Sequence, residues 1–459
     1  MNEISAKKTI ETVLELGSKY FDGVEASLVG SDVSTSRFAE SQMTQNQSPE
    51  QHKLSLRVLK DGRQIRMDSS DTSLSGMREL VNNANRAVKF SEPDPDLQEI
   101  LDSESGSGSG FGPANEGQET SVPDRLDPMV KRMSAGQRAV HVGNIVQIAD
   151  EAGLTAAGVV ASGTHFEAVG NSRGLFRYHE ETHAECSVTM VNEDSSGWAK
   201  SQSPRLSDVD PGRLARIAAD KAKGASSPAD IVPGKYTAIL EPSAVLDLMG
   251  FLLWDFAATS HRDRQTCLLG RVGEKVFGDN INIRDDVYDP RQAGAAFDAE
   301  GVSRRRVSLV ENGRLVDLVY GRRSASLSGK QATGHGLAEP SAMGEYPHNL
   351  VMDGGEASLE NMIESTDQGI LLSRVWYVRT VDPARKILTG MTRDGTFKVE
   401  NGAIVNGVKN LRFNISLLEL LNQVEILGVP VRAAGEETGP AVVPAMKVAA
   451  FNFTEVTRF

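Results

Sequence analysis

Residues 175–191 read Leu-Phe-Arg-Tyr-His-Glu-Glu-Thr-His-Ala-Glu-Cys-Ser-Val-Thr-Met-Val, and the conformation of this stretch decides the fold. It contains the pattern H-E-x-x-H, in which a helix aligns two histidines for zinc and the glutamate activates a water molecule. Polar and apolar residues alternate over 186–190, and a turn-forming run at 171–174 precedes the stretch, which is typical of a strand. A strand separates His179 from His183 by about 13 Å, too far for one zinc ion. We therefore predict a strand.

The alternative interpretation of this stretch is a zinc site with His179 and His183 as ligands and Glu180 as the general base. It requires a helix, and no third ligand is marked at helical spacing downstream. Composition alone produces an H-E-x-x-H pattern in roughly one chain of this kind in a hundred, so the pattern is modest evidence. We expect neither a catalytic residue nor a metal ligand here.

The composition bounds the class of protein. A chain of 459 residues, 39% of them hydrophobic, is long enough for two or three globular domains. The net charge of −13 argues against nucleic-acid binding, because phosphate contacts need clustered Lys and Arg. Two cysteines cannot build a disulfide framework, no secretory signal opens the chain, and no apolar run is long enough to span a bilayer. We expect a cytoplasmic protein that binds neither nucleic acid nor membrane.

The first half of the chain predicts two α/β units joined by a linker. Residues 102–120 are rich in Ser and Gly and should form a flexible linker between units at 1–101 and 121–228. Apolar spacing predicts one helix that begins near Ser5, a second that is capped near Asp71 or Ser73, and two more over 127–152 and 211–225. The predicted strands are 23–28, 35–38, 53–59, 64–67, 155–162 and 165–169.

The second half, 229–459, is mostly β. A helix is predicted over 243–258, and hairpins are predicted where Asn312-Gly313 and Asn401-Gly402 form the turns. Two such hairpins suggest a barrel or a sandwich. The predicted fold class is α+β, with two N-terminal α/β units followed by a β-rich C-terminal domain.

Three residues of the second half are candidates for substrate binding: Asp298, Glu300 and Gly334. Two carboxylates beside a glycine can form a general acid/base pair, but the same residues are common in turns, which is the interpretation we favour. Gly334 belongs to a glycine-containing segment that lacks the phosphate-loop spacing and could lie along a bound peptide.

Six segments in a fixed order, spread over nearly the whole chain, together resemble the TldD/PmbA family. This family has long been called modulators of DNA gyrase and is understood as two-subunit metalloproteases. The segments are Ser36-Arg37-Phe38-Ala39 with Thr44-Gln45-Asn46, Asn171-Ser172-Arg173-Gly174, Phe297-Asp298-Ala299-Glu300-Gly301, Glu311-Asn312-Gly313, Ser324-Ala325 with Thr333-Gly334, and Phe397-Lys398-Val399-Glu400-Asn401-Gly402.

The resemblance implies a particular subunit. The catalytic TldD-type subunit carries H-E-x-x-x-H on the helix that opens its C-terminal domain and a cysteine ligand near its C-terminus. Here the corresponding residues, 243–258, contain no His or Glu, and no cysteine follows Cys267. The chain is thus similar to the partner-type subunit, PmbA or TldE, which has the same fold without the metal.

The resemblance also implies a function. It implies no cofactor in this chain, zinc in a TldD-type partner, a heterodimer with that partner or a homodimer, a peptide substrate, and no activity without the partner. Two alternatives stay open: a stand-alone zinc metallopeptidase that uses His179, Glu180 and His183, and a homodimeric peptide-binding or scaffold protein without protease activity.

Overall fold

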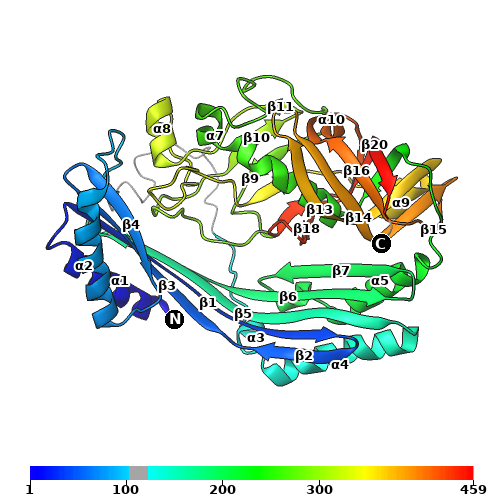
Figure 1. Cartoon of the computed structure of the whole chain (residues 1–459), viewed down its shortest axis with the longest axis horizontal. Helices are drawn as coiled ribbons and strands as arrows, with labels where there is room; N and C mark the ends of the chain where they lie inside the picture. Colours follow the sequence, from blue (N-terminus) through cyan, green and yellow to red (C-terminus); the bar gives the residue numbers. More distant parts are fainter. Residues whose placement is uncertain (103–121, 458–459) are drawn as a thin grey trace.

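The computed structural model describes residues 1–102 and 122–457, which form two layers (Figure 1). The lower layer in Figure 1 is a long antiparallel sheet from the N-terminal half, and the upper layer is the β-rich C-terminal half. Apart from Asp102, the predicted Ser/Gly linker at 102–120 lies outside the described residues.

The lower layer is a seven-stranded sheet with the order β4-β3-β1-β5-β6-β7, and β2 pairs with the far part of β1. Its strands are β1 Gly23–Ala39, β2 Gln42–Gln47, β3 Glu50–Lys60, β4 Arg63–Ser69, β5 Thr155–Asn171, β6 Phe176–Val191 and β7 Ser196–Ser203. The strand predicted over 175–191 is β6, so that prediction is confirmed. The helix that the zinc alternative requires is not formed.

Two strands are longer than predicted. β1 unites the strands predicted at 23–28 and 35–38, and β5 unites those predicted at 155–162 and 165–169. The two strands pair with each other without interruption from Glu25 and Asn171 to Phe38 and Gly158. The connecting residues were not recognised as strand because they are mostly small or polar and show no apolar alternation.

The helices of this layer are α1 Glu3–Gly17, α2 Leu74–Ala87, α3 Pro128–Lys131, α4 Ala135–Ala152 and α5 Pro211–Gly224, with 3-10 turns η1 Val88–Phe90 and η3 Leu206–Asp208. Of the two predicted caps of α2, Asp71 and Ser73, the structure has Ser73. α1 begins earlier than predicted, because Asn2 caps it in place of Ser5. The helix predicted over 127–152 is interrupted before α4, where Ser134 and Gln137 form a capping box that starts a new helix.

Two hydrophobic clusters cover one face of this sheet. In the first, α1 packs on β1 and β5 and α2 packs on β3 and β4. In the second, α4 packs on β5 and β1 and α5 packs on β6 and β7. The division into units at 1–101 and 121–228 stays a prediction. The structure adds that both units share one sheet, whose other face turns toward the C-terminal domain.

The C-terminal domain contains two sheets. The strands are β8 Gly234–Leu240, β9 Ile283–Asp285, β10 Val307–Glu311, β11 Arg314–Leu315, β12 Leu350–Met352, β13 Gln368–Asp382, β14 Ile387–Glu400, β15 Ala403–Gly407, β16 Leu411–Ser416, β17 Val424–Leu427, β18 Val431–Ala433, β19 Ala441–Val443 and β20 Met446–Val456. One sheet has the order β11-β10-β9-β12-β19-β18. In the other, β13-β8-β20-β16-β14 closes on itself because β13 also pairs with β14, which gives a five-stranded barrel. The predicted β-rich domain is confirmed.

The two Asn-Gly turns are formed as predicted. They join β10 to β11 and β14 to β15, and both residues of each turn have positive φ, as a type I′ hairpin requires. The helix predicted over 243–258 is divided into α6 Pro242–Met249, the 3-10 helix η4 Gly250–Phe256 and the start of α7 Ala258–Arg262. The remaining helices are α8 Arg322–Ser328, α9 Leu359–Glu364 and α10 Leu417–Leu421. None of the helices in the described ranges is long and apolar enough to cross a membrane.

Candidate functional site

The H-E-x-x-H residues lie on both faces of β6. Alternation along the strand places His179 and His183 on the face turned toward the C-terminal domain, with Glu181 between them. The Nε2 atom of His179 lies 3.2 Å from Glu181 Oε2. Glu180 lies on the opposite face, where Lys131 Nζ donates to its Oε1 at 2.5 Å. His179, Glu180 and His183 therefore do not point to one place. Across residues 1–102 and 122–457, no group of three His, Cys, Asp or Glu side chains is placed to hold a metal ion.

On this face, β5 and β6 carry an alternating cluster of imidazoles and carboxylates, here called the checkerboard. Its members are His165 and Glu167 of β5 and His179, Glu181 and His183 of β6. His165 of β5 is directly opposite Glu181, and Glu167 is directly opposite His179. Burial raises the pKa of Glu167. Burial also raises the pKa of Glu181, but hydrogen bonds from His179 and from the Gly294 N–H outweigh it and hold the pKa below its usual range. The checkerboard can donate and accept hydrogen bonds and exchange protons.

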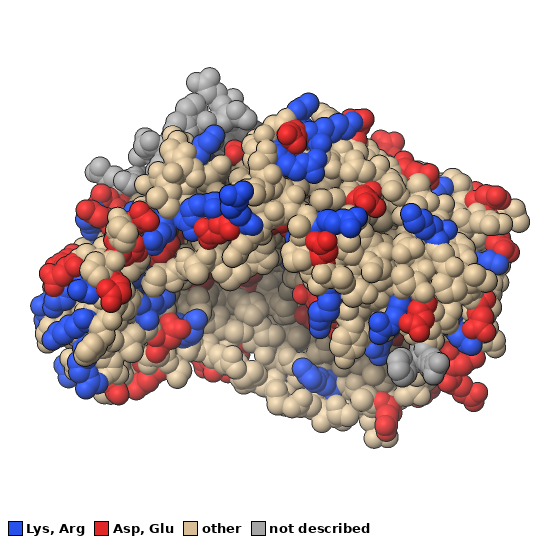
Figure 2. Space-filling model, turned by 45° about the horizontal axis from the view of Figure 1, so that its top comes forward, with Lys and Arg blue, Asp and Glu red and all other residues tan. Residues whose placement is uncertain are grey.

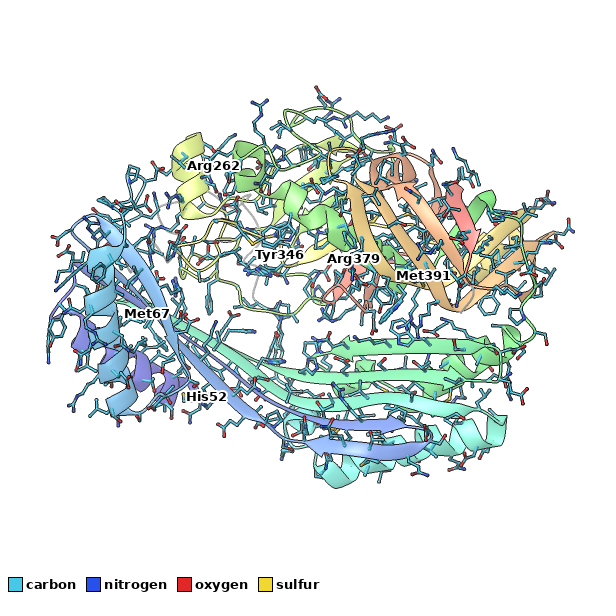
Figure 3. The ribbon with its side chains drawn as sticks, in the orientation of Figure 1. His52, Met67, Arg262, Tyr346, Arg379 and Met391 are labelled. Atoms are coloured by element: carbon cyan, nitrogen blue, oxygen red, sulfur yellow. The ribbon has the colours of Figure 1, made fainter. Side chains whose placement is uncertain are left out.

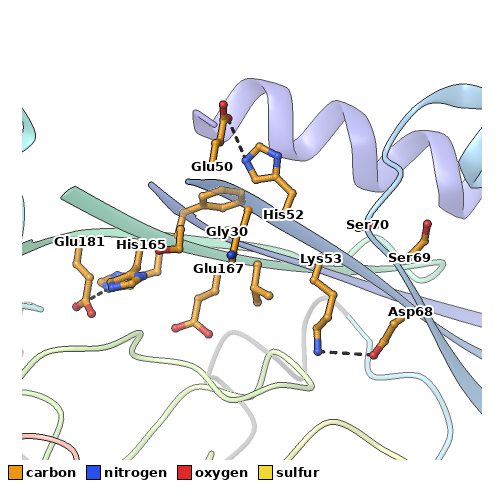
Figure 4. Close-up of a pocket in the computed structure, with 15 residues that line it drawn as sticks. Gly30, Glu50, His52, Lys53, Asp68, Ser69, Ser70, His165, Glu167 and Glu181 are labelled. Atoms are coloured by element: carbon orange, nitrogen blue, oxygen red, sulfur yellow. Dashed lines mark hydrogen bonds and ion pairs between the residues drawn. The ribbon is translucent and has the colours of Figure 1, made fainter. Parts of the chain in front are cut away.

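A cavity of about 920 Å³ borders the checkerboard (Figure 4). Its walls include His165, Glu167 and Glu181 together with residues of β1, β3 and β4. Figure 4 shows Glu167, Lys53 and Asp68 directed to the same side of the sheet, and Lys53 Nζ lies 3.6 Å from Asp68 Oδ2. Charged side chains therefore line part of the cavity, beside apolar groups such as Phe166.

Figure 2 shows a hollow between the two layers, and all residues that line the cavity belong to the N-terminal layer. Figure 3 shows Met67 on the sheet side of this space and Tyr346 and Arg379 on the side of the C-terminal domain. The hollow is large enough to accept a small ligand or a short stretch of extended chain.

Asp298, Glu300 and Gly334 are brought together beside this hollow. Asp298 Oδ1 accepts hydrogen bonds from the backbone N–H groups of Glu300 and Val302, and its Oδ2 accepts one from Gly336. Gly334 has a φ of +74°, and a Cβ atom there would lie 2.4 Å from the Ser303 carbonyl oxygen. Asp298 and Glu300 are each only 2% exposed. The segment is a tightly hydrogen-bonded turn, as its composition indicates, and the substrate-binding role of its residues stays a prediction.

Glu300 is the centre of a buried charge cluster that joins the two layers. Its Oε2 accepts a hydrogen bond from Arg322 at 2.9 Å and lies 3.7 Å from Arg57 Nη1 of β3. The same Arg57 atom lies 3.7 Å from Glu25 Oε2 of β1. Burial, reinforced by the charges of Asp298 and Glu25, raises the pKa of Glu300 to about 7, although Arg322 and Arg57 oppose this. Burial also raises the pKa of Asp298.

Sequence reasoning missed Arg57 and Glu25, and it missed a second buried group around His335. His335 Nε2 lies 2.8 Å from Asp285 Oδ1, and its Nδ1 lies 2.8 Å from Thr333 Oγ1. All three side chains are almost fully buried, so this arrangement has no access to a substrate and fixes the loop around Gly334.

The helix that opens the C-terminal domain does not fit a zinc ion. The ionisable side chains of α6 and η4 are Asp247 and Asp255. Asp247 accepts hydrogen bonds from the three backbone N–H groups of 436–438. Asp255 forms an ion pair with Lys386 at 2.5 Å and accepts the N–H of Cys267. Burial raises the pKa of the Cys267 thiol to about 12, so it stays protonated at neutral pH.

Comparisons with known proteins match two consecutive parts of the chain. Residues 115–225 match the family model described as the PmbA/TldA metallopeptidase central domain. Residues 233–455 match the one described as the PmbA/TldA metallopeptidase C-terminal domain. The two matches together span well over half of the chain.

Individual proteins show the same likeness. Metalloprotease PmbA of Escherichia coli O157:H7 is 23% identical over 459 residues, which cover 96% of each chain. An uncharacterized protein of Methanocaldococcus jannaschii is 24% identical over 300 residues, which cover 64% of this chain and 69% of that protein. The crystal structure of TldE from Thermococcus kodakarensis has a TM-score of 0.85 at 20% identity and covers 97% of this chain and 100% of its own. At that identity, the structural likeness shows a shared fold.

Proposed function

The chain belongs to the PmbA/TldD metallopeptidase family. We propose that it is the non-catalytic, PmbA/TldE-type subunit of a two-subunit peptidase. In this proposal a TldD-type partner carries the zinc ion and the catalytic glutamate. The present chain helps to enclose an unfolded peptide substrate. The pair works in the cytoplasm, where the free thiols of Cys186 and Cys267 remain reduced.

The observation that carries the proposal is the chemistry of α6 and η4. The resemblance to the family places the catalytic H-E-x-x-x-H on this helix, but the helix here offers only Asp247 and Asp255. Both carboxylates are already bound to backbone N–H groups or to Lys386. A zinc ion would have to displace these partners and would still lack the imidazole ligands usual in peptidases.

The full-length likenesses support the same subunit type. The alignment with metalloprotease PmbA covers 96% of each chain, and the structure of TldE superimposes over 97% of this one. Both names are those of the partner-type subunit in the resemblance described above.

The hollow between the layers suits an extended peptide. Among the strands of the described residues, β4 pairs only with β3, and Asp68 and Ser69 at its end and Ser70 after it line the cavity. An extended chain can be held there by backbone hydrogen bonds to the strand edge, which need no particular side chains. The imidazoles and carboxylates of β5 and β6 offer further hydrogen bonds.

The test is a reconstitution with the homologue from the same genome that carries H-E-x-x-x-H. Each protein is purified alone, its zinc content is measured by elemental mass spectrometry, and cleavage of an unfolded polypeptide such as reduced casein is followed with each protein and with the mixture. We expect cleavage by the mixture alone, zinc in the partner, and a stable heterodimer in light scattering.

Two variants locate the catalytic glutamate. Replacing the glutamate of the partner's H-E-x-x-x-H by glutamine should abolish cleavage by the mixture, whereas Glu180→Gln in the present chain should leave it unchanged. Loss of cleavage with Glu180→Gln, or zinc-dependent cleavage by this chain alone, would refute the proposal. A stable homodimer that never binds the partner would refute the pairing.

A further inference from the structure

A second cavity, of about 760 Å³, lies at the β7 edge of the N-terminal sheet. Its walls are the end of β7 with the turn after it, the first turns of α5, and two loops of the C-terminal domain at 290–292 and 430–432. Residues 124 and 125 complete the lining. It shares no lining residue with the cavity at the checkerboard.

The charge of this second cavity is opposite to that of the chain. The chain has 49 basic and 62 acidic residues, but the described lining has six basic and three acidic side chains. The basic residues are Arg125, Lys200, Arg205, Arg213, Arg291 and Arg432, and the acidic ones are Asp124, Asp208 and Asp210. A local excess of positive charge in an acidic protein indicates a site for an anion.

Four of these arginines form no ion pair with any side chain in the described ranges: Arg125, Arg205, Arg213 and Arg432. The other two basic side chains are paired, Lys200 with Glu185 at 3.6 Å and Arg291 with Asp289 at 2.7 Å. The positive charge of these arginines is only partly offset, by Glu181 at Arg125 and by Glu181 and Asp208 at Arg432.

The acidic residues of the lining are held by local hydrogen bonds. Asp208 Oδ2 accepts from the Ser203 hydroxyl at 2.6 Å. Asp210 caps α5 by accepting the backbone N–H of Arg213 at 3.0 Å, and Asp124 accepts the Leu126 N–H at 3.0 Å. Within the part of the chain that the structure describes, none of the three carboxylates is bound to a guanidinium of the cavity. Arg125 already donates to the carbonyl oxygens of Gly294 and Val287. The side chains of Arg205, Arg213 and Arg432 therefore remain available to an anion.

Arg432 is fixed in position and partly desolvated. Its Nε donates to the Gln202 carbonyl oxygen at 3.0 Å, and its Nη1 donates to that of Arg291 at 2.9 Å. Its Nη2 has no acceptor among the residues that the structure describes. Burial, with a contribution from the charge of Arg125, lowers the pKa of Arg432 to about 10 although Glu181 opposes this, so the guanidinium is still charged at neutral pH. A fixed, partly buried guanidinium binds oxyanions more strongly than an exposed one.

The uncharged part of the lining has six apolar residues and five polar ones. Leu214 and Ile217 of α5 line one part of the cavity, and Pro204, Pro290, Pro430 and Val431 line another. The volume is several times that of a small inorganic anion, so the cavity has room for an apolar body beside a charged head group.

We propose that this second cavity binds a ligand that joins a carboxylate to an apolar body, with the carboxylate at Arg432 and Arg213. The chemistry is that of a peptide C-terminus whose last side chain is apolar. The peptide source rests on the proposed function. The carboxylate site itself rests only on the geometry and charge of the cavity.

Calorimetric titration of the full chain, without any partner, tests the site with three probes: N-acetyl-leucine, N-acetyl-leucinamide and inorganic phosphate. We expect N-acetyl-leucine to bind at least tenfold more tightly than the amide. Its affinity should fall as the salt concentration rises, because the interaction is between opposite charges. Phosphate should compete only weakly, because it does not fill the apolar part.

Two arginines of α5 provide matched variants. Arg213 lines the cavity, whereas Arg216, one turn along the same helix and also exposed, does not. Arg213→Gln should weaken N-acetyl-leucine about tenfold, the usual effect of one charge-assisted hydrogen bond, and Arg216→Gln should change nothing. Arg432→Gln should weaken it further. Because Arg432 also bridges two loops, its variant is compared only after its unfolding transition is shown to be intact.

Equal affinities for N-acetyl-leucine and its amide would overturn the proposal, and so would equal effects of Arg213→Gln and Arg216→Gln. Binding of phosphate without N-acetyl-leucine would overturn the carboxylate assignment. These outcomes are independent of peptidase activity: a chain that binds N-acetyl-leucine as expected but never pairs with a zinc-bearing subunit would retain the site and lose the proposed function.

Discussion

Glu300 Oε2 lies 3.7 Å from Arg57 Nη1, and both side chains are almost fully buried between the N-terminal sheet and the C-terminal domain. Arg57 Nη1 makes no hydrogen bond in the described structure, so it acts on Glu300 and Glu25 through its charge. One guanidinium thus stabilises carboxylates from both layers, and its removal should affect the contact between them.

Arg57→Met should destabilise the chain by about 1–3 kcal/mol, because Gln64 and the Gln98 carbonyl lose a buried hydrogen-bond donor. Glu25 and Glu300 then keep one close guanidinium each, that of Arg66 and that of Arg322. Urea unfolding followed by circular dichroism measures the change. Arg271→Met is the control, because Arg271 pairs with the exposed Glu274 and such surface pairs contribute about 0–1 kcal/mol. Similar effects of the two substitutions would contradict the importance of the buried cluster.

We expect the free energy of unfolding to fall as pH rises from about 4.5 to about 7, because Glu300 loses its proton in the folded chain over this range. Burial raises its pKa from 4.5 to about 7 in the folded chain, so the folded state binds this proton more tightly than the unfolded state. The contribution of Glu300 is therefore complete below pH 4.5 and is lost as pH rises through 7. Glu300→Gln should remove that part of the pH dependence, which urea unfolding at a series of pH values detects. Glu274→Gln, on the surface, controls for the loss of one negative charge, and parallel profiles for wild type and Glu300→Gln would rule out the effect.

Gly334→Ala should cost about 1–3 kcal/mol more than Gly329→Ala. Both glycines have positive φ, so both substitutions carry the same backbone strain. A Cβ atom at Gly334 meets the Ser303 carbonyl oxygen at 2.4 Å, whereas a Cβ atom at Gly329 has open space. Thermal or urea unfolding of the two variants gives the difference, and equal costs would show that the turn adjusts freely.

His179→Ala and His183→Ala should leave the metal content of the purified chain unchanged. The two histidines are four residues apart in β6, which separates them by about 13 Å. Elemental mass spectrometry of the wild type and both variants, after incubation with zinc and desalting, tests this. One zinc ion per chain that disappears in either variant would restore the metallopeptidase alternative.

The sequence predicted those parts of the fold whose pattern is local. Alternation over 186–190 identified β6. The Asn-Gly pairs identified the two hairpins of the C-terminal domain, because Asn and Gly are the residues that most readily adopt positive φ at successive positions. The middle of β1 was missed, because its residues 29–34 carry few large apolar groups and residues 29–31 border a cavity. A strand of this kind lacks the periodic signal.

The candidate site was only partly predictable, for a similar reason. Asp298 and Glu300 stood out because two carboxylates flank a turn glycine. Arg57 alternates with the buried Leu56 and Val58 and therefore resembles a solvent-facing residue of a half-buried strand. Gln98 and Glu300, about 40 and more than 200 residues later in the chain, help to cover its side chain. No local sequence pattern around Arg57 predicts an ion pair with a residue as far along the chain as Glu300.

The continuous pairing of β1 with β5 joins the two hydrophobic clusters of the N-terminal sheet. β1 gives Leu28 to the first cluster and Phe38 to the second, and β5 gives Phe166 to the first and Val160 to the second. Separate lobes on a flexible hinge could melt one at a time. Here, unfolding of either cluster would break hydrogen bonds of the continuous β1–β5 pairing that also supports the other cluster. The N-terminal half should therefore unfold as one cooperative unit and resist proteolytic cleavage between its parts.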